Sequence, residues 1–145
     1  MAYTTINDPT AYFQVKAWTG TAATNALTFG GATAMAPDLV WIKNKSTAYD
    51  HHLYDTTRGV QTAYASNNAE AESTKTTGLT AFGSDGFTVG DDNGVNKSGD
   101  GIVSWSWKES ATSGFDIITF VGNQTARTIS HSLSAVPKFM YIKNR

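Results

Sequence analysis

The chain repeats a short apolar segment, and this repeat restricts the possible folds more than any other feature of the sequence. Residues 37–45 read PDLVWIKNK and residues 137–145 read PKFMYIKNR, at an offset of 100 positions. A second pair of segments lies upstream of these copies, since residues 13–20 (FQVKAWTG) match residues 115–122 (FDIITFVG) at an offset of 102. Self-similarity at such a period indicates a modular architecture rather than a single irregular enzyme fold.

The repeat also divides the chain into segments. Residues 1–11 are polar and predict an N-terminal arm, and residues 12–109 predict one complete unit of ordinary domain size. After a short linker, residues 115–145 predict the start of a second unit, which stops at the counterpart of Lys45. This second segment has two interpretations: the beginning of a repeat within a longer protein, or an addition that completes a sheet edge.

Alternating polarity predicts an all-β fold with little helix. Residues 13–18 alternate between two faces, and residues 39–43 are apolar on both faces, as is typical of a strand in the centre of a sheet. Residues 62–72 are rich in Ala and leave room for one helical turn. Many short strands separated by turn formers predict an antiparallel β-sandwich of the jelly-roll or lectin-like type. Further strands are expected at residues 26–29, 49–55, 86–89 and 102–107, the last two joined as a long-looped hairpin.

Composition excludes several classes of function. The absence of cysteine excludes disulfides, thiol catalysis and cysteine-based metal sites. Eleven basic and 12 acidic residues leave a net charge of −1, which provides no electrostatic surface for nucleic acid. No apolar run approaches the roughly 18 residues of a membrane helix, and the first ten residues lack the pattern of a signal peptide. The sequence therefore predicts neither a nucleic-acid partner nor membrane insertion.

No group of residues stands out as catalytic. Ser84 does not lie in the G-x-S-x-G pattern of a nucleophile elbow, and Asp85 is expected to begin a turn. The acidic residues are not brought together in pairs by their sequence positions, as a glycosidase would require. We therefore expect no enzymatic activity and no cofactor.

Two polar clusters are weak candidates for metal binding. Asp91, Asp92 and Asn93 provide oxygen ligands, but the EF-hand spacing and its terminal Glu are absent, so a solvated hairpin turn is the favoured interpretation. His51 and His52 are adjacent, and neighbouring residues of a strand point to opposite faces, which disfavours one shared ion. A polar loop or an interface contact is the preferred role of His51.

Aromatic residues provide the best indication of a binding surface, because Trp and Tyr rings stack on sugars and anchor protein interfaces. Trp41, Trp105 and Trp107 are expected in the core. Trp18, Tyr49 and Tyr54 are less obviously inward-facing, and together with His51 they are the weakly predicted ligand or partner surface. A separate expectation is that Asp55 and Arg58 brace a local turn.

Four motifs together resemble a repeat domain of virion proteins from tailed phages, mainly marine and cyanobacterial ones. Residues 37–45 are similar to that family's P-D-hydrophobic-W-hydrophobic-K-N-R strand, and residues 55–59 (DTTRG) to its D-x-x-R-G turn. Residues 82–90 (FGSDGFTVG) are similar to its F-x-S-D-G-F-T-hydrophobic-G segment, and residues 103–108 (VSWSWK) to its V-A-W-x-W-K segment. The opening residues 1–13 resemble the start of tail-fibre-like proteins that carry these repeats.

The resemblance implies a lectin-like β-sandwich in a structural or attachment protein of a tail fibre or tail appendage. Such a protein is made in the host cytoplasm, is released within the virion and docks on other virion proteins through its N-terminal arm. A homotrimer and a host-surface glycan are the further partners implied. The alternatives are a stand-alone carbohydrate-binding module and a polysaccharide-degrading enzyme of the tailspike type.

Overall fold

A computed structural model describes residues 5–144 of the chain. Asp8 caps the first element, where its Oδ1 accepts hydrogen bonds from the Thr10 amide at 3.0 Å and the Thr10 hydroxyl at 2.5 Å. Short strands follow along residues 13–107. The elements are η1 (Pro9–Ala11), β1 (Phe13–Thr19), β2 (Asn25–Thr28), β3 (Leu39–Asn44), β4 (His52–Asp55), β5 (Thr62–Ala65), β6 (Ser73–Thr74), β7 (Leu79–Gly83), β8 (Gly86–Val89), α1 (Asn93–Asn96) and β9 (Gly101–Trp107).

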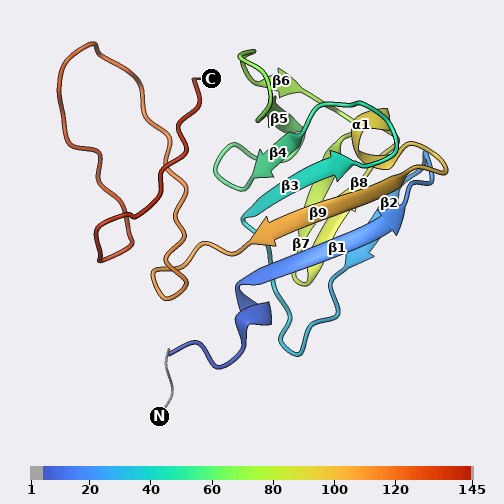
Figure 1. Cartoon of the computed structure of the whole chain (residues 1–145), viewed down its shortest axis with the longest axis horizontal. Helices are drawn as coiled ribbons and strands as arrows, with labels where there is room; N and C mark the ends of the chain where they lie inside the picture. The colour runs from blue at the N-terminus through green and yellow to red at the C-terminus, as the bar shows by residue number, and fades with distance from the viewer. Residues whose placement is uncertain (1–4, 145) are drawn as a thin grey trace.

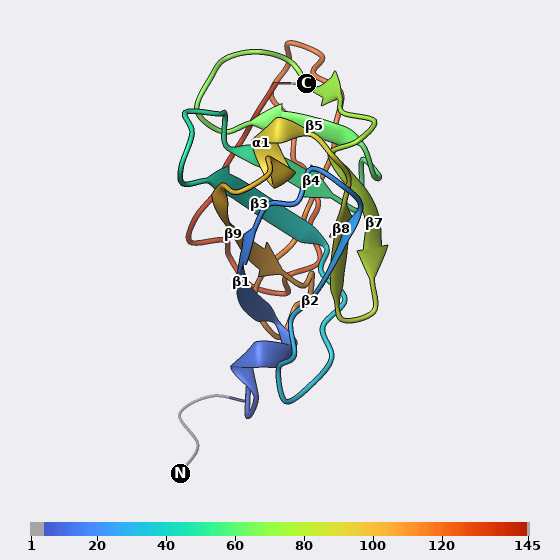
Figure 2. The ribbon, with the colours of Figure 1, turned by 90° about the vertical axis from the view of Figure 1, so that its right-hand side faces the viewer.

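The strands form two antiparallel sheets that pack as layers (Figures 1 and 2). One sheet has six strands in the order β1-β9-β3-β4-β5-β6, and the other has three in the order β2-β8-β7. The predicted all-β sandwich with little helix is confirmed, as is the central position of β3, which lies between β9 and β4.

Two local expectations are wrong because long-range pairing decides the structure. The strands β8 and β9 do not form a hairpin: β8 pairs with β2 and β7, whereas β9 pairs with β1 and β3 in the other sheet. The chain crosses between the layers through α1, which the sequence analysis did not anticipate. Residues 62–65 form β5 rather than a helical turn, since Leu53 and His52 of β4 supply ladder partners for them.

The core lies between the sheets, and it takes the smaller side chains of β9. Ile102, Ser104 and Ser106 face inward and are fully buried. Trp105 and Trp107 occupy the alternate positions and lie half-buried on the outer face, as Trp41 does on β3, so their expected core placement is wrong. Rings from other segments also pack in the core. Trp18, Phe29 and Phe87 form a cluster there, with the Phe87 ring centroid 5.9 Å from each of the other two.

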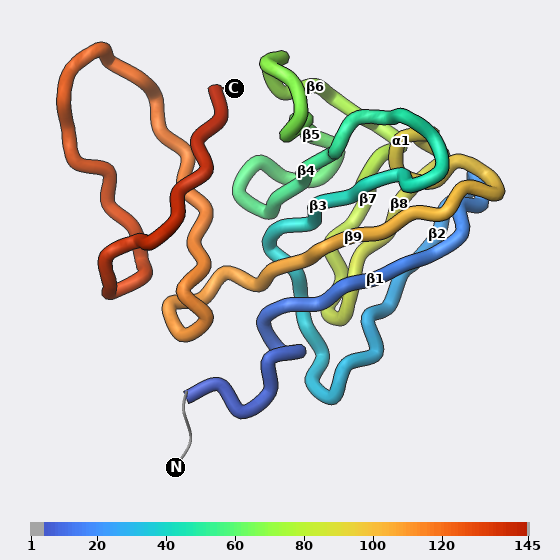
Figure 3. Tube along the Cα trace, in the orientation of Figure 1, coloured from blue at the N-terminus to red at the C-terminus, as the bar shows by residue number. Residues whose placement is uncertain are grey.

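The second copy of the repeat does not form strands. Residues 115–144 contain no strand: Phe115 makes an isolated bridge with Ser110, and the segment then follows an irregular path beside the sandwich (Figure 3). Met140 and Ile142 are 73% and 72% exposed, whereas their counterparts Val40 and Ile42 are fully buried. The segment therefore completes no sheet edge.

The matched glycines Gly20 and Gly122 provide a test of this difference. A Cβ at buried Gly20 would lie 2.0 Å from the Lys97 carbonyl oxygen, while a Cβ at Gly122 would meet no atom within 4 Å. We expect Gly20→Ala to lower the free energy of unfolding by about 2 kcal/mol, because the backbone must move to relieve the clash. Gly122→Ala should change it by less than about 0.5 kcal/mol. Urea denaturation of both variants measures the two changes in the free energy of unfolding, and equal changes would contradict the structure.

Candidate functional site

The four side chains expected to form a ligand or partner surface do not lie together. Tyr54 is fully buried in the core, and Trp18 packs against the core through Phe87. The expectation that these two rings face outward is therefore wrong. His51 is half-buried, and its backbone amide donates to Asn67 Oδ1 at 2.9 Å.

Tyr49, the remaining candidate, lines a groove of about 370 Å³ at the junction of the β3–β4 loop, β4 and α1. A narrower depression of about 60 Å³ continues from it toward β5 and shares three of its lining residues, Asp50, His52 and Lys75. We call this region the His52 groove. Its principal lining residues are Tyr49, Asp50, His52, Lys75, Asp92 and Gly94.

His52 is the distinctive residue of this groove. Its side chain is only 6% exposed, and its Nδ1 is buried without a hydrogen-bond partner among the described residues. The ring lies at a tilted edge-on contact with Tyr54, at a centroid distance of 6.3 Å. Its other edge faces Gly94, where an added Cβ would come within 2.4 Å of His52 Cε1 and 2.9 Å of Nδ1. Glycine at position 94 therefore lets the backbone of α1 pack closely against this edge of the imidazole.

His51, and not His52, was expected at the ligand or partner surface, although the sequence also carries a signal for His52. His52 and Tyr54 are two residues apart on one strand, so they share a face. The inward partner of His52 is Ile42, which is fully buried. Lys75 was missed for a different reason, since only the fold brings residue 75 beside residues 49–52 and 91–94.

Burial is the main cause of a lowered pKa at His52, because desolvation disfavours the imidazolium. Four charged groups around the ring also shift the pKa of His52, two upward and two downward. The carboxylates of Asp92 and Asp50 raise the pKa of His52, while the ammonium groups of Lys75 and Lys43 lower it. The net lowering keeps His52 neutral at pH 7, so one ring nitrogen remains a hydrogen-bond acceptor.

The lowered pKa predicts a loss of stability on acidification. Above pH 6.5, the ordinary value, His52 is neutral in both the folded and the unfolded chain. As the pH falls below that value, the unfolded chain takes up a proton that the folded chain resists, so the free energy of unfolding decreases. The limiting slope is about 1.4 kcal/mol per pH unit for one proton. Denaturation midpoints measured between pH 7.5 and about pH 5 check this prediction.

The contribution of Glu109 to the pH dependence of stability must be eliminated, because a hydrogen bond with Asp116 and desolvation raise the pKa of Glu109 to about 7. A raised carboxyl pKa gives the opposite slope, since the folded chain then holds the proton more tightly. The comparison is therefore made in a Glu109→Gln background, with and without His52→Phe. If His52→Phe leaves the pH dependence unchanged, His52 is not the responsible group.

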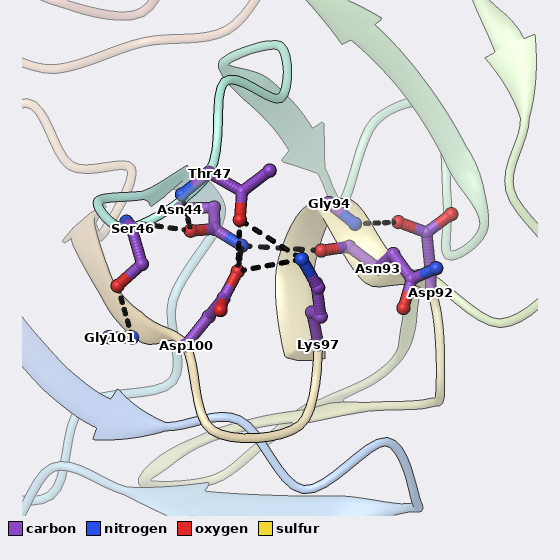
Figure 4. Close-up of polar contacts among 9 residues, drawn as sticks. All are labelled: Asn44, Ser46, Thr47, Asp92, Asn93, Gly94, Lys97, Asp100 and Gly101. Carbon is purple, nitrogen blue, oxygen red and sulfur yellow. Dashed lines mark hydrogen bonds and ion pairs between the residues drawn. The ribbon is translucent and has the colours of Figure 1, made fainter.

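Beside the groove, a network of polar contacts joins the end of β3 to the loop before β9 (Figure 4). The buried Asn44 donates through Nδ2 to Asp100 Oδ2 at 2.8 Å and to the Asn93 carbonyl at 3.4 Å. Asn44 Oδ1 accepts the amides of Ser46 and Thr47, each at 2.9 Å. Asn44, the Asn of the repeated K-N motif, therefore links the loop after β3 to the loop before β9. We call this hydrogen-bonded link the Asn44 clamp.

Two of the three weak metal candidates have structural roles. Asp92 caps α1, with its Oδ1 accepting the Gly94 amide at 2.8 Å, and Asn93 supplies its carbonyl to Asn44. Asp91 is exposed at the groove. Across residues 5–144, no three His, Cys, Asp or Glu side chains are grouped so that they could hold a metal ion. In the same range no helix has the length and apolar character needed to cross a bilayer.

The predicted brace between Asp55 and Arg58 is confirmed. Arg58 Nε donates to Asp55 Oδ2 at 2.6 Å, and the two side chains are each 3% exposed. The Arg58 guanidinium also lies 3.9 Å above the centre of the Tyr64 ring. This pair fixes the turn after β4 and holds Tyr64 on the outer side of the six-stranded sheet.

Comparison with known proteins adds one assignment. A family model described as a domain of unknown function (DUF7483) matches residues 8–145. The chain belongs to this family. The DUF7483 match includes the sandwich and the segment that follows β9, so this segment is part of the family's domain. No curated protein and no solved structure matches the chain.

Proposed function

We propose that the chain is a structural and attachment module of a phage virion, carried in a tail fibre or tail appendage. The motifs at residues 37–45, 55–59, 82–90 and 103–108 support the virion assignment through their resemblance to phage repeat domains. In this proposal the N-terminal arm docks on other virion proteins, and β-sandwich units present a host-binding end. A homotrimer is the expected assembly.

The observation that carries the proposal is an apolar row across the outer face of the six-stranded sheet. Five neighbouring strands each contribute one side chain, and the ladder registers place these side chains opposite one another. The row is Val15, Trp105, Trp41, Leu53 and Tyr64, of which Leu53 is already buried at 4% exposure. An aromatic face of this kind on a repeated unit favours stacking of units, because each unit buries apolar surface against its neighbour.

Contacts of the second repeat support this interpretation. Phe115, the counterpart of Phe13, stacks on Trp107 with ring centroids 6.1 Å apart. Tyr141, the counterpart of Trp41, stacks on Tyr64 at 6.5 Å, and Lys143 Nζ donates to the Asn68 carbonyl at 2.7 Å. Segments of the second repeat therefore already lie against side chains of the outer face of the first unit.

The test is the presence of the chain in particles. We expect antibodies against residues 12–109 to label tail structures of purified phage, and mass spectrometry to find the chain in the same particles. Sedimentation at high protein concentration should show an oligomer. A strict monomer that is missing from purified particles would remove the proposal.

A carbohydrate-binding module is the second candidate, and the His52 groove favours it. Tyr49 and Lys75 lie on the groove together with carboxylates and a buried imidazole, so a small polar ligand has donors and acceptors available. This candidate does not need a virion, and a ligand titration with the isolated chain tests it separately.

A further inference from the structure

We propose that the contact between Glu109 and Asp116 is a pH-dependent switch for residues 115–144, which we call the C-terminal segment (Figure 3). A proton shared by the two side chains holds the segment against the sandwich, and loss of that proton releases it. The switch depends only on contacts within one chain. Its use rests on the proposed function, since release uncovers rings of the outer face that stacking between units needs.

Backbone geometry places the two carboxyl groups opposite each other. After β9, residues 110–115 form a closed turn, in which the Ser110 amide donates to the Phe115 carbonyl at 2.9 Å and the Phe115 amide donates to the Ser110 carbonyl at 3.2 Å. The next two opposed residues of such an antiparallel pair are Glu109 and Asp116. Two ionised carboxylates in opposed positions repel each other, whereas a shared proton makes them a hydrogen-bonded pair.

Asp116 is the partner that stays ionised. Its Oδ1 accepts the Ile117 amide at 3.0 Å, and its Oδ2 accepts the Ser132 amide at 2.6 Å. The hydrogen bond from Glu109 and these amide donors lower the pKa of Asp116, because they stabilise the carboxylate. The same two amides belong to separate parts of the C-terminal segment. Glu109 therefore connects the sandwich to a carboxylate that organises this segment.

Glu109 is the partner that carries the proton. Its backbone amide donates to Asp38 Oδ2 at 2.8 Å, and the Thr56 hydroxyl donates to Asp38 Oδ1 at 3.1 Å, so a second carboxylate is fixed beside Glu109. The hydrogen bond with Asp116, desolvation and the negative charges of Asp116 and Asp38 raise the pKa of Glu109 to about 7, and the Ile117 amide opposes them only in part. Both neighbouring charges therefore disfavour ionised Glu109.

The C-terminal segment lies against two rings of the outer face. Phe115 stacks on Trp107, and Tyr141 stacks on Tyr64. Residues 115–144 contain no strand, so the segment is held by side-chain contacts and a few hydrogen bonds rather than by a ladder. A segment attached in this way opens at a low cost in free energy, which makes it sensitive to one ionisation at its base. Its release would free Trp107 and Tyr64 for a neighbouring unit.

The direction of the pH effect follows from the raised pKa of Glu109. The held state binds the proton more tightly, so its advantage is complete below the ordinary pKa of 4.5 and is lost as the pH rises through about 7. We expect the ratio of held to released chains to fall about tenfold between about pH 5.5 and about pH 8.5. The pKa of Asp116 is lowered from 3.8, so Asp116 stays ionised across this interval.

The experiment measures the position of the C-terminal segment by double electron–electron resonance on the full chain. The sequence contains no cysteine, so spin labels attach only where cysteines are introduced. Thr57→Cys lies on the turn after β4 and Met140→Cys lies on the C-terminal segment, both at exposed positions. We expect a narrow distance distribution at about pH 5.5 and a broad one at about pH 8.5, with a midpoint near the Glu109 pKa of about 7.

Glu109→Gln is the decisive variant, because the Gln amide donates a hydrogen bond to Asp116 at every pH in this interval. We expect this variant to keep the narrow distribution at both ends. Asp91→Asn removes an exposed carboxylate from the loop before α1, and as the matched control it should retain the wild-type transition. His131→Gln should retain it as well, which separates Glu109 from the titratable side chain next to Ser132.

The proposal is overturned if the wild-type distance distribution is the same at both ends of the pH interval. It is equally overturned if Glu109→Gln retains the transition, because another group would then be responsible, or if this variant is released at both ends. The switch is measured on the isolated chain, whereas the virion assignment is tested on purified particles. Failure of one is therefore distinguishable from failure of the other.

Discussion

Replacing Ile42 by Ala should lower the free energy of unfolding by about 4 kcal/mol. Ile42 is fully buried in the core and lies on β3 between His52 of β4 and Ser104 of β9. Truncation removes apolar surface from the core and leaves a cavity that the flanking strands cannot close, because both are fixed by their ladders. Equilibrium denaturation in urea, monitored by tryptophan fluorescence, measures the difference.

Ile142→Ala is the matched control for that measurement. Ile142 occupies the same position in the second copy of the motif, but it is 72% exposed. We expect its truncation to change the free energy of unfolding by less than about 0.5 kcal/mol. A comparable loss at both positions would mean that the Ile142 side chain is packed in solution, in disagreement with the structure.

Asn44→Ala should lower the free energy of unfolding by about 3 kcal/mol. The substitution removes four hydrogen bonds of a buried amide, two of them with the Ser46 and Thr47 amides. Asp100 would keep its contacts with Thr47 at 2.7 Å and Lys97 at 3.7 Å, but the link between β3 and the loop before β9 would be lost. Thermal unfolding and hydrogen exchange at residues 92–101 report the two effects together.

Asn144→Ala provides the control for the clamp, because Asn144 is the exposed counterpart of Asn44. We expect the same unfolding temperature as the wild type and unchanged exchange at residues 92–101. An Asn44→Ala protein as stable as the wild type would show that the amide is not a clamp and that the loops are held by other contacts.

The contrast between the two copies follows from sheet topology. The strands β1 and β3 do not pair with each other, since both are hydrogen-bonded to β9, which lies between them. The second copy repeats the β1 and β3 segments at residues 115–122 and 137–145, but residues 109–145 contain no second V-x-W-x-W segment equivalent to β9. Without that central partner, the backbone groups of the two segments have no ladder to join, and they remain irregular.

Some features of this protein were determined by sequence alone. Alternating polarity predicted β1 and β9, because a period of two is a local property of a strand, and a short run that is apolar on both faces predicted β3. Turn chemistry predicted the Asp55–Arg58 brace, whose partners are three residues apart. Of the residues that line the groove, the sequence singled out Tyr49 as part of a ligand or partner surface, and Asp91, Asp92 and Asn93 as weak metal candidates.

The tertiary structure decided which face of each strand is buried and which segments meet. Alternation defines two faces of β9 but does not say which one points inward. In the structure the face with Ser104 and Ser106 points inward, and the face with Trp105 and Trp107 points outward. The His52 groove joins residues 49–52, 75 and 91–94, which no local pattern links. Pairing between distant strands depends on the hydrogen-bond partners available across the whole sheet, so short-range sequence patterns cannot specify it.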